Sequence, residues 1–109
     1  MILTTKEVKG VVVVYVAGAI FFGQESEPLR ILIKRLLCTA SRIVLDLEKV
    51  SHIDSGGVGN LVAVYVSARN LGGNIKLANV TDHTREVLRT TNLDTVFEIF
   101  DKTEDAIES

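Results

Sequence analysis

The sequence Ile53-Asp54-Ser55-Gly56-Gly57-Val58-Gly59 joins an aliphatic run, residues 42–47, to an amphipathic segment, residues 56–71. The aliphatic run, RIVLDL, is typical of a buried strand, because branched apolar side chains pack well on a sheet. In the amphipathic segment, apolar residues recur at intervals of three or four, which predicts a helix. The predicted face consists of Val58, Leu61, Val62, Tyr65 and Arg69. Ser55 thus stands where a helix begins, and its hydroxyl is expected to accept from a free backbone N–H as the N-cap.

The rest of the chain alternates between strands and helices. Residues 3–8 and 11–17 predict an antiparallel hairpin, because only the tight turn Lys9-Gly10 separates them. A loop over 18–25 leads to a helix that begins near Ser26 and Pro28, since proline suits the first helical turn. That helix is expected to run to about residue 39. The elements expected after Gly72-Gly73 are a strand over 74–80, a helix from 81 or 82 to 89, a short strand over 96–100 and a helix over 103–108.

This order of elements predicts the fold class. Strands that alternate with helices favour a mostly parallel sheet with right-handed crossovers, which place helices on its faces. A chain of 109 residues suits one domain. We therefore expect a single α/β domain over residues 1–109, in which the N-terminal antiparallel hairpin continues into a mostly parallel sheet with about four helices.

Composition narrows the choice of partner and compartment. The net charge is −2, from 12 basic and 14 acidic residues without a basic run, which argues against nucleic acid as a partner. The uncharged run over residues 11–22 is too short for a membrane span, which needs about 20 apolar residues, and its β-branched character predicts a strand. The lone Cys38 excludes an internal disulfide and fits a reducing, cytoplasmic compartment. The sequence leaves self-association open.

Enzyme chemistry finds little support. The serine-hydrolase motif Gly-x-Ser-x-Gly is absent, because Ile53 stands two residues before Ser55, and His52 and His83 are expected to be ordinary surface or hydrogen-bonded histidines. The glycines lack the lysine of a nucleotide-binding P-loop, and no metal or cofactor is expected. Asp46, inside the aliphatic strand, is expected to accept hydrogen bonds from a neighbouring loop, because a buried carboxylate needs partners.

The position of Ser55 favours a covalent switch. A phosphate on Ser55 would add a charge of about −1.5 to −2. At the N-terminus of a helix, the dipole favours a negative group by roughly 0.3–1 kcal/mol, so phosphorylation should leave the fold intact. A protein that docks over the glycines, however, would have to bury that charge, which is costly.

The stretch Asp54-Ser55-Gly56-Gly57-Val58-Gly59, between RIVLDL and an apolar helix, resembles the STAS domain of bacterial anti-sigma factor antagonists. The usual motif of that family is Asp-Ser-Ser/Thr-Gly-Leu-Gly, and its first serine is phosphorylated. The likeness covers nearly the whole chain, including Gly18-Ala19-Ile20, residues 72–77 and residues 92–97.

The resemblance implies a cycle of partner switching. The unphosphorylated antagonist binds an anti-sigma factor that is a serine kinase, which frees the sigma factor, and phosphorylation by that kinase releases it. A PP2C-type phosphatase restores the first state. Carried over to this chain, Ser55 is the acceptor, and the docking surface includes Asp54, Gly56, Gly57, Val58 and Gly59.

The chain departs from the family pattern at two places. Gly56 replaces the second hydroxyl of the motif, and the first loop reads Gly18-Ala19-Ile20-Phe21 where the family has Gly-x-Leu-Asp. Phe21 and Phe22 thus replace the loop aspartate and predict a more apolar partner surface, although at least one of them is expected to pack under the first helix. These departures leave a second hypothesis, a STAS module without a switch, such as a scaffold or an accessory subunit of a stress-signalling or lipid-transport assembly. A nucleotide-binding protein is a third.

Overall fold

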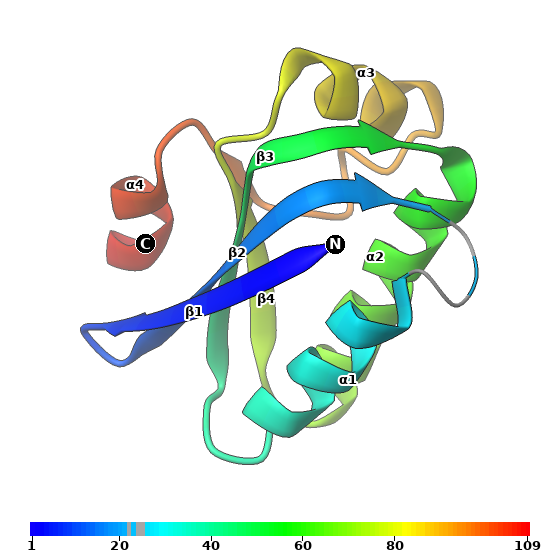
Figure 1. The fold of residues 1–109 in the computed structure, drawn as a ribbon. Coiled ribbons are helices and arrows are strands. Elements are labelled where there is room, and N and C mark those ends of the chain that lie inside the picture. The colour runs from blue at the N-terminus through cyan, green and yellow to red at the C-terminus, as the bar shows by residue number, and fades with distance from the viewer. Residues whose placement is uncertain (22, 24–25) are drawn as a thin grey trace.

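A mixed β-sheet forms the centre of the computed structural model, which describes residues 1–21, 23 and 26–109 (Figure 1). Its strands lie in the order β1-β2-β3-β4-β5, and β1 is antiparallel to β2 whereas the other neighbouring pairs are parallel. The strands are β1 (Ile2–Val8), β2 (Val11–Ile20), β3 (Arg42–Ile53), β4 (Asn74–Ala78) and β5 (Ile99–Phe100). This is the predicted α/β class, with the predicted hairpin at its N-terminus.

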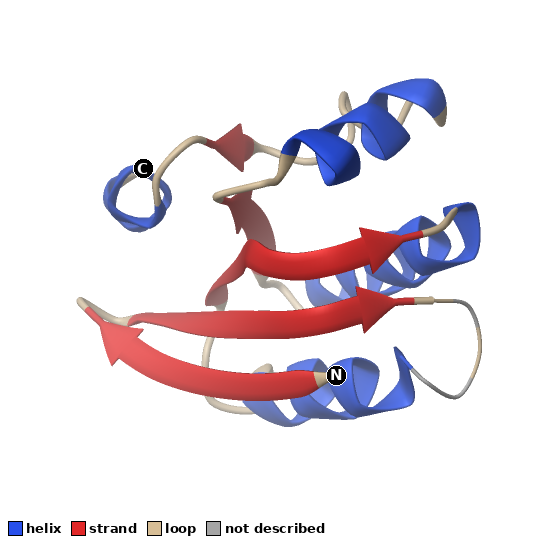
Figure 2. Ribbon diagram, turned by 45° about the horizontal axis from the view of Figure 1, so that its top comes forward, coloured by secondary structure: helices blue, strands red, loops and turns tan. Residues whose placement is uncertain are grey.

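Helices cover both faces of the sheet (Figure 2). They are α1 (Glu27–Leu36), α2 (Ser55–Asn70), α3 (Asp82–Thr90) and α4 (Thr103–Glu108). The larger core lies on the face of α1 and α2, where Val14, Leu45 and Leu61 are fully buried, and α3 adds Leu88 to it. The smaller core, on the other face, packs Val13 of β2 against Ala106 and Ile107 of α4 and their neighbours. None of the helices in the described residues is long and apolar enough to cross a membrane.

The hairpin has the predicted turn, but β2 is longer than predicted. Lys9 and Gly10 both have positive φ, at 53° and 79°, which suits a two-residue turn between twisted strands. The strand then continues past residue 17 to Ile20, so the predicted loop over 18–25 begins too early. The reason is pairing: Ala19 and Ile20 lie opposite residues of β3, and Gly18 passes through positive φ without ending the strand.

The strand β3 also runs further than predicted, to Ile53 rather than residue 47. Its second half is polar, and its buried residues Leu47, Val50 and Ile53 recur every third position instead of every second. The pairing of β2 with β3 shifts register twice in this half, which marks bulges. Because each bulge adds a residue that faces outward, the alternating pattern that identifies a strand is lost. This longer β3 carries the chain directly to Asp54.

The remaining boundaries differ by a few residues. The helix α1 ends at Leu36, short of residue 39, and β5 contains only Ile99 and Phe100 of the predicted range 96–100. Thr81 caps α3, one of the two predicted caps, and α4 has its predicted bounds. In α2, Val58 and Leu61 are buried as expected, but so are Val64 and Ala68, whereas Arg69 is exposed.

Two contacts hold α4 and the β4–α3 loop in place. Asp46 is 5% exposed and accepts hydrogen bonds from Asn79 Nδ2 at 2.9 Å and from Thr103 Oγ1 at 2.7 Å, which confirms the expected loop partner. At the hairpin turn, the Lys9 ammonium pairs with Glu108 near the end of α4. The hydrogen bond and the charge of Lys9 together lower the pKa of the Glu108 carboxyl below its usual value.

Candidate functional site

Asp54, and not Ser55, is the N-cap of α2. Its backbone is extended (φ −105°, ψ 177°), and its Oδ1 accepts a hydrogen bond of 2.7 Å from the Gly57 N–H. Its carbonyl accepts from the Val58 N–H at 3.0 Å, which is the first turn of the helix. The prediction that the Ser55 hydroxyl caps the helix is therefore wrong, because the carboxylate one residue earlier already reaches the free N–H.

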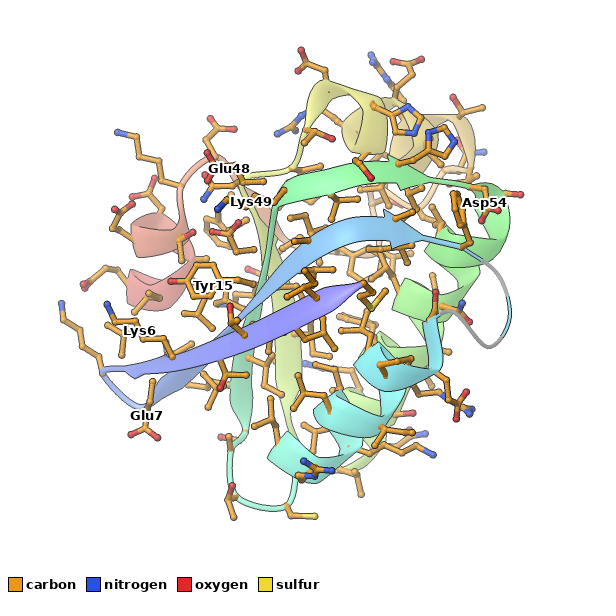
Figure 3. All side chains as sticks on the ribbon, in the orientation of Figure 1. Lys6, Glu7, Tyr15, Glu48, Lys49 and Asp54 are labelled. Atoms are coloured by element: carbon orange, nitrogen blue, oxygen red, sulfur yellow. The ribbon has the colours of Figure 1, made fainter. Side chains whose placement is uncertain are left out.

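With Asp54 as the cap, the Ser55 side chain is not needed to cap α2. Ser55 is the first residue of α2 and is exposed. Its hydroxyl takes part in no hydrogen bond among the residues that the structure describes. The neighbouring Asp54 is exposed as well, and Figure 3 places it at the opposite end of the sheet from Lys6, with Tyr15 between them. A hydroxyl group in such a place is accessible to another protein.

The glycine-rich segment divides into an outer and an inner part. Gly59 is exposed and Gly56 is half-buried, whereas Gly57 and Val58 lie in the interior. At Gly57 a Cβ atom would overlap with the carbonyl oxygen of Ile20, so α2 lies directly against the end of β2. Of the residues predicted for docking, Gly57 and Val58 therefore position the helix, and the accessible ones surround Ser55.

Phe21, the residue after β2, is held close to α2. The carbonyl oxygen of Phe21 accepts a hydrogen bond from Asn60 Nδ2 of α2 at 3.1 Å and another from the hydroxyl of Ser26. Phe21 is half-buried, and its ring lies against His52 of β3, with 5.6 Å between the ring centroids. Phe22, the other aromatic residue predicted for docking, lies outside the described residues.

Sequence reasoning missed a row of three rings beside this loop. His52 stacks on His83 of α3 with centroids 4.6 Å apart and ring planes at 22°, and the Phe21 ring contacts His52 at a tilt of 59°. The Nε2 atom of His83 lies 3.3 Å from the nitrogen and 3.2 Å from the oxygen of Ile53. We call Phe21, His52 and His83 the ring ledge. One available signal was topology, since in a parallel sheet the end of β3 and the start of α3 lie at the same edge.

Two hollows in the described part of the molecule lie away from the start of α2. A groove of about 250 Å³ opens over the sheet between β1 and the bulged part of β3, and its lining includes Tyr15, Ala17 and Lys49. A smaller one, of about 60 Å³, lies near Arg42 and Ala106. Neither is lined by Asp54 or Ser55. No three His, Cys, Asp or Glu residues among those described are grouped so that they could hold a metal ion.

The fold and this helix start define a class of protein. A family profile described as STAS domain matches residues 3–106, and the chain belongs to this family.

Relatives with similar sequences carry more specific names. A Thermotoga neapolitana protein named "Putative anti-sigma factor antagonist TM1081 homolog" is 34% identical over 68 residues, which are 62% of this chain and 60% of that protein. The match therefore spans less than two thirds of that relative.

Solved structures agree. The crystal structure of a Thermotoga maritima protein, "putative anti-sigma factor antagonist (tm1081)", superposes with a TM-score of 0.85 at 27% identity. The match covers 97% of this chain and 92% of the other. An anti-sigma factor antagonist from Mycobacterium paratuberculosis has a TM-score of 0.82 at 25% identity, with 98% and 91% covered.

Proposed function

We propose that this chain is an anti-sigma factor antagonist whose binding to an anti-sigma factor kinase is switched off by phosphorylation of Ser55. The observation that carries the proposal is that Asp54 and Ser55, neighbours at the start of α2, have different roles. Asp54 caps the helix, and Ser55 beside it is exposed, with no hydrogen bond from its hydroxyl to any residue of 1–21, 23 and 26–109, so its modification breaks no contact within those ranges. The names of the relatives support the same class of function.

The chemistry of the switch follows from this position. The kinase transfers the γ-phosphoryl group of ATP to Ser55 Oγ, the hydroxyl loses its proton, and ADP leaves. The new phosphate lies at the N-terminus of α2, where the dipole stabilises a negative charge by roughly 0.3–1 kcal/mol. The domain should therefore keep its shape. The partner must then bury a charge of about −1.5 to −2 in its interface, and each loss of about 1.4 kcal/mol weakens binding tenfold.

This cycle implies two binding partners and a cellular compartment for the chain. A serine kinase binds the accessible residues around Ser55, and a PP2C-type phosphatase removes the phosphate. Both reactions belong in the cytoplasm of a bacterial cell, where ATP and the sigma factor are found. In this proposal the chain binds and is modified but catalyses nothing itself.

Four versions of the protein, used as baits in a lysate of the native organism, test the proposal. They are the wild type and the Ser55→Ala, Ser55→Gln and Ser55→Glu variants, and mass spectrometry identifies what each captures. Gln matches Glu in size, so the pair isolates the charge. We expect wild type, Ala and Gln to retain a serine kinase that Glu loses, and the purified kinase with ATP to phosphorylate wild type but not Ser55→Ala. Equal capture by Gln and Glu would contradict the switch.

The second hypothesis is a STAS module that binds its partner permanently. It is favoured by Phe21, whose ring stands where the family has an aspartate and lies against His52. The same baits decide between the two. Identical partners on all four baits, without phosphorylation of Ser55, would identify a constitutive scaffold or an accessory subunit.

A further inference from the structure

We propose that the ring ledge is the second half of the docking surface, in which His52 contacts the partner and His83 is a positioning residue. The inference rests on the proposed function, because its occupant is the same kinase that docks at Ser55. It assigns a binding role to two histidines that belong neither to the switch nor to either hydrophobic core.

The three rings come from three separate elements and meet outside the core. Phe21 follows β2, His52 is near the end of β3, and His83 is in the first turn of α3. Both histidines are exposed, and the two ring contacts, at 5.6 and 4.6 Å between centroids, place them in one row. A row of rings on the surface does not contribute to the buried core, whereas aromatic side chains are enriched where proteins bind each other.

The ledge is continuous with the surface around Ser55. His83 bonds to the backbone of Ile53, the residue directly before the cap Asp54. On the other side, the carbonyl of Phe21 is held by Asn60 of α2. Both ends of the row are thus hydrogen-bonded to residues near Ser55 in the sequence: Ile53 precedes it, and Asn60 follows it in α2. A protein large enough to cover Ser55 would therefore meet the ledge as well.

The stack also explains why the ledge suits binding. His52 is exposed on a strand, and a free imidazole there would sample several rotamers. Stacking on His83 and the tilted contact with Phe21, at 59° between the ring planes, restrict that freedom before the partner arrives. Side chains that are already ordered lose less entropy on association, so the same contact gives a higher affinity. In this arrangement His83 acts through His52, which faces the partner.

Affinity measurements with the kinase obtained from the Ser55 baits test the ledge. The kinase is expressed, purified and titrated by biolayer interferometry against wild type, His52→Ala, His52→Phe and Tyr15→Ala. Tyr15 is the control, because its ring is also exposed but lies in the middle of β2, away from Asp54 (Figure 3). We expect His52→Ala to weaken binding about tenfold, His52→Phe to restore most of it, and Tyr15→Ala to change nothing.

Two variants of His83 separate positioning from stability. His83→Phe keeps a ring in the stack without the hydrogen bond to Ile53, and His83→Gln keeps a hydrogen-bonding group without the ring. If His83 positions His52 by stacking, Phe should retain the affinity and Gln should lose about as much as His52→Ala. Urea unfolding of each variant shows whether the fold is equally stable, so a loss of affinity can be assigned to the ledge.

The possible failures can be told apart. If Ser55→Glu loses the kinase but His52→Ala binds as tightly as Tyr15→Ala, the ledge is wrong and the switch stands. If no kinase discriminates between Ser55→Gln and Ser55→Glu, the proposed function is wrong, and the ledge as a kinase-binding surface is wrong with it.

Discussion

The backbone of Gly57, in the first turn of α2, lies directly against the carbonyl oxygen of Ile20 at the end of β2. A Cβ atom on Gly57 would overlap with that oxygen and would stand 3.0 Å from the side chain of Ile53. The helix that carries Ser55 therefore packs backbone to backbone against the sheet. Because Gly57 has no side chain, the start of α2 can lie this close to the end of β2.

Gly57→Ala should destabilise the protein by about 3 kcal/mol, the upper part of the range for overpacked sites, because backbone on both sides leaves little room to relax. Gly59, two residues later in the same helix, is the control, since a Cβ there meets nothing within 4 Å. Gly59→Ala should stabilise the protein by roughly 0.5–1 kcal/mol, because alanine favours a helix. Free energies of unfolding in urea measure both. Similar values for the two variants would mean that α2 can move away from β2.

The cap Asp54 has a structural role that can be measured apart from docking. Asp54→Ala should cost about 1 kcal/mol of unfolding free energy, the usual effect of a lost N-cap, whereas Asp54→Asn should cost much less, because an amide oxygen can still accept from Gly57. Thr81→Ala, which removes the side-chain cap of α3, provides the matched value for a second helix. An Asp54→Asn variant as unstable as Asp54→Ala would show that charge, and not the hydrogen bond, stabilises this end of α2.

The fold class could be predicted from the sequence, and the junction at Ser55 could be singled out as a candidate site, because both depend on local patterns. The turn at Lys9-Gly10, the alternation of strands with helices and the junction at Ser55 are each encoded within a few adjacent residues. The end of β3 was missed because its bulges replace the period of two by a period of three. The cap was assigned to Ser55 because serine and aspartate are both good caps, and only the extended backbone of Asp54 decides between them.

The ring ledge could not be read from local patterns. His52 and His83 are far apart in sequence, and neither stands in a recognisable motif. Their contact requires α3 to return to the end of β3, and the stack depends on side-chain directions that the two register shifts in β3 alter. From the sequence alone, each histidine is therefore predicted to be an ordinary surface or hydrogen-bonded residue.

Negative charge at position 55 should leave the fold intact. Ser55→Glu places a carboxylate in the first turn of α2, where the helix dipole favours a negative charge. The unfolding free energy of Ser55→Glu should therefore exceed that of Ser55→Gln by roughly 0.3–1 kcal/mol. High salt should reduce the difference, because screening weakens an exposed charge. Urea unfolding at low and high ionic strength measures it. If Ser55→Glu were clearly less stable than Ser55→Gln, a loss of partners in Ser55→Glu would have to be explained by unfolding rather than by charge in the interface.

The buried carboxylate of Asp46 should stabilise the fold without affecting the switch. Its oxygens accept from the backbone N–H of Glu48 at 3.0 Å and from the side chains of Asn79 and Thr103. Asp46→Asn keeps the volume but replaces an accepting oxygen by an NH₂ donor, which would face the donors of Asn79 and Thr103. We expect a loss of about 1–3 kcal/mol, the usual result of an unsatisfied buried polar group.

Thr103→Val provides the comparison for Asp46, because it removes one donor and leaves the carboxylate with its other two partners. Because Thr103 Oγ1 also accepts from Asn79 Nδ2 at 2.8 Å, the variant loses two hydrogen bonds and should cost about 1–3 kcal/mol. Partner capture should be unchanged in both variants under conditions where they are folded, since the network lies between β3, the β4–α3 loop and α4 rather than at the start of α2. If Asp46→Asn abolished capture while remaining folded, the docking surface would have to extend to this part of the sheet.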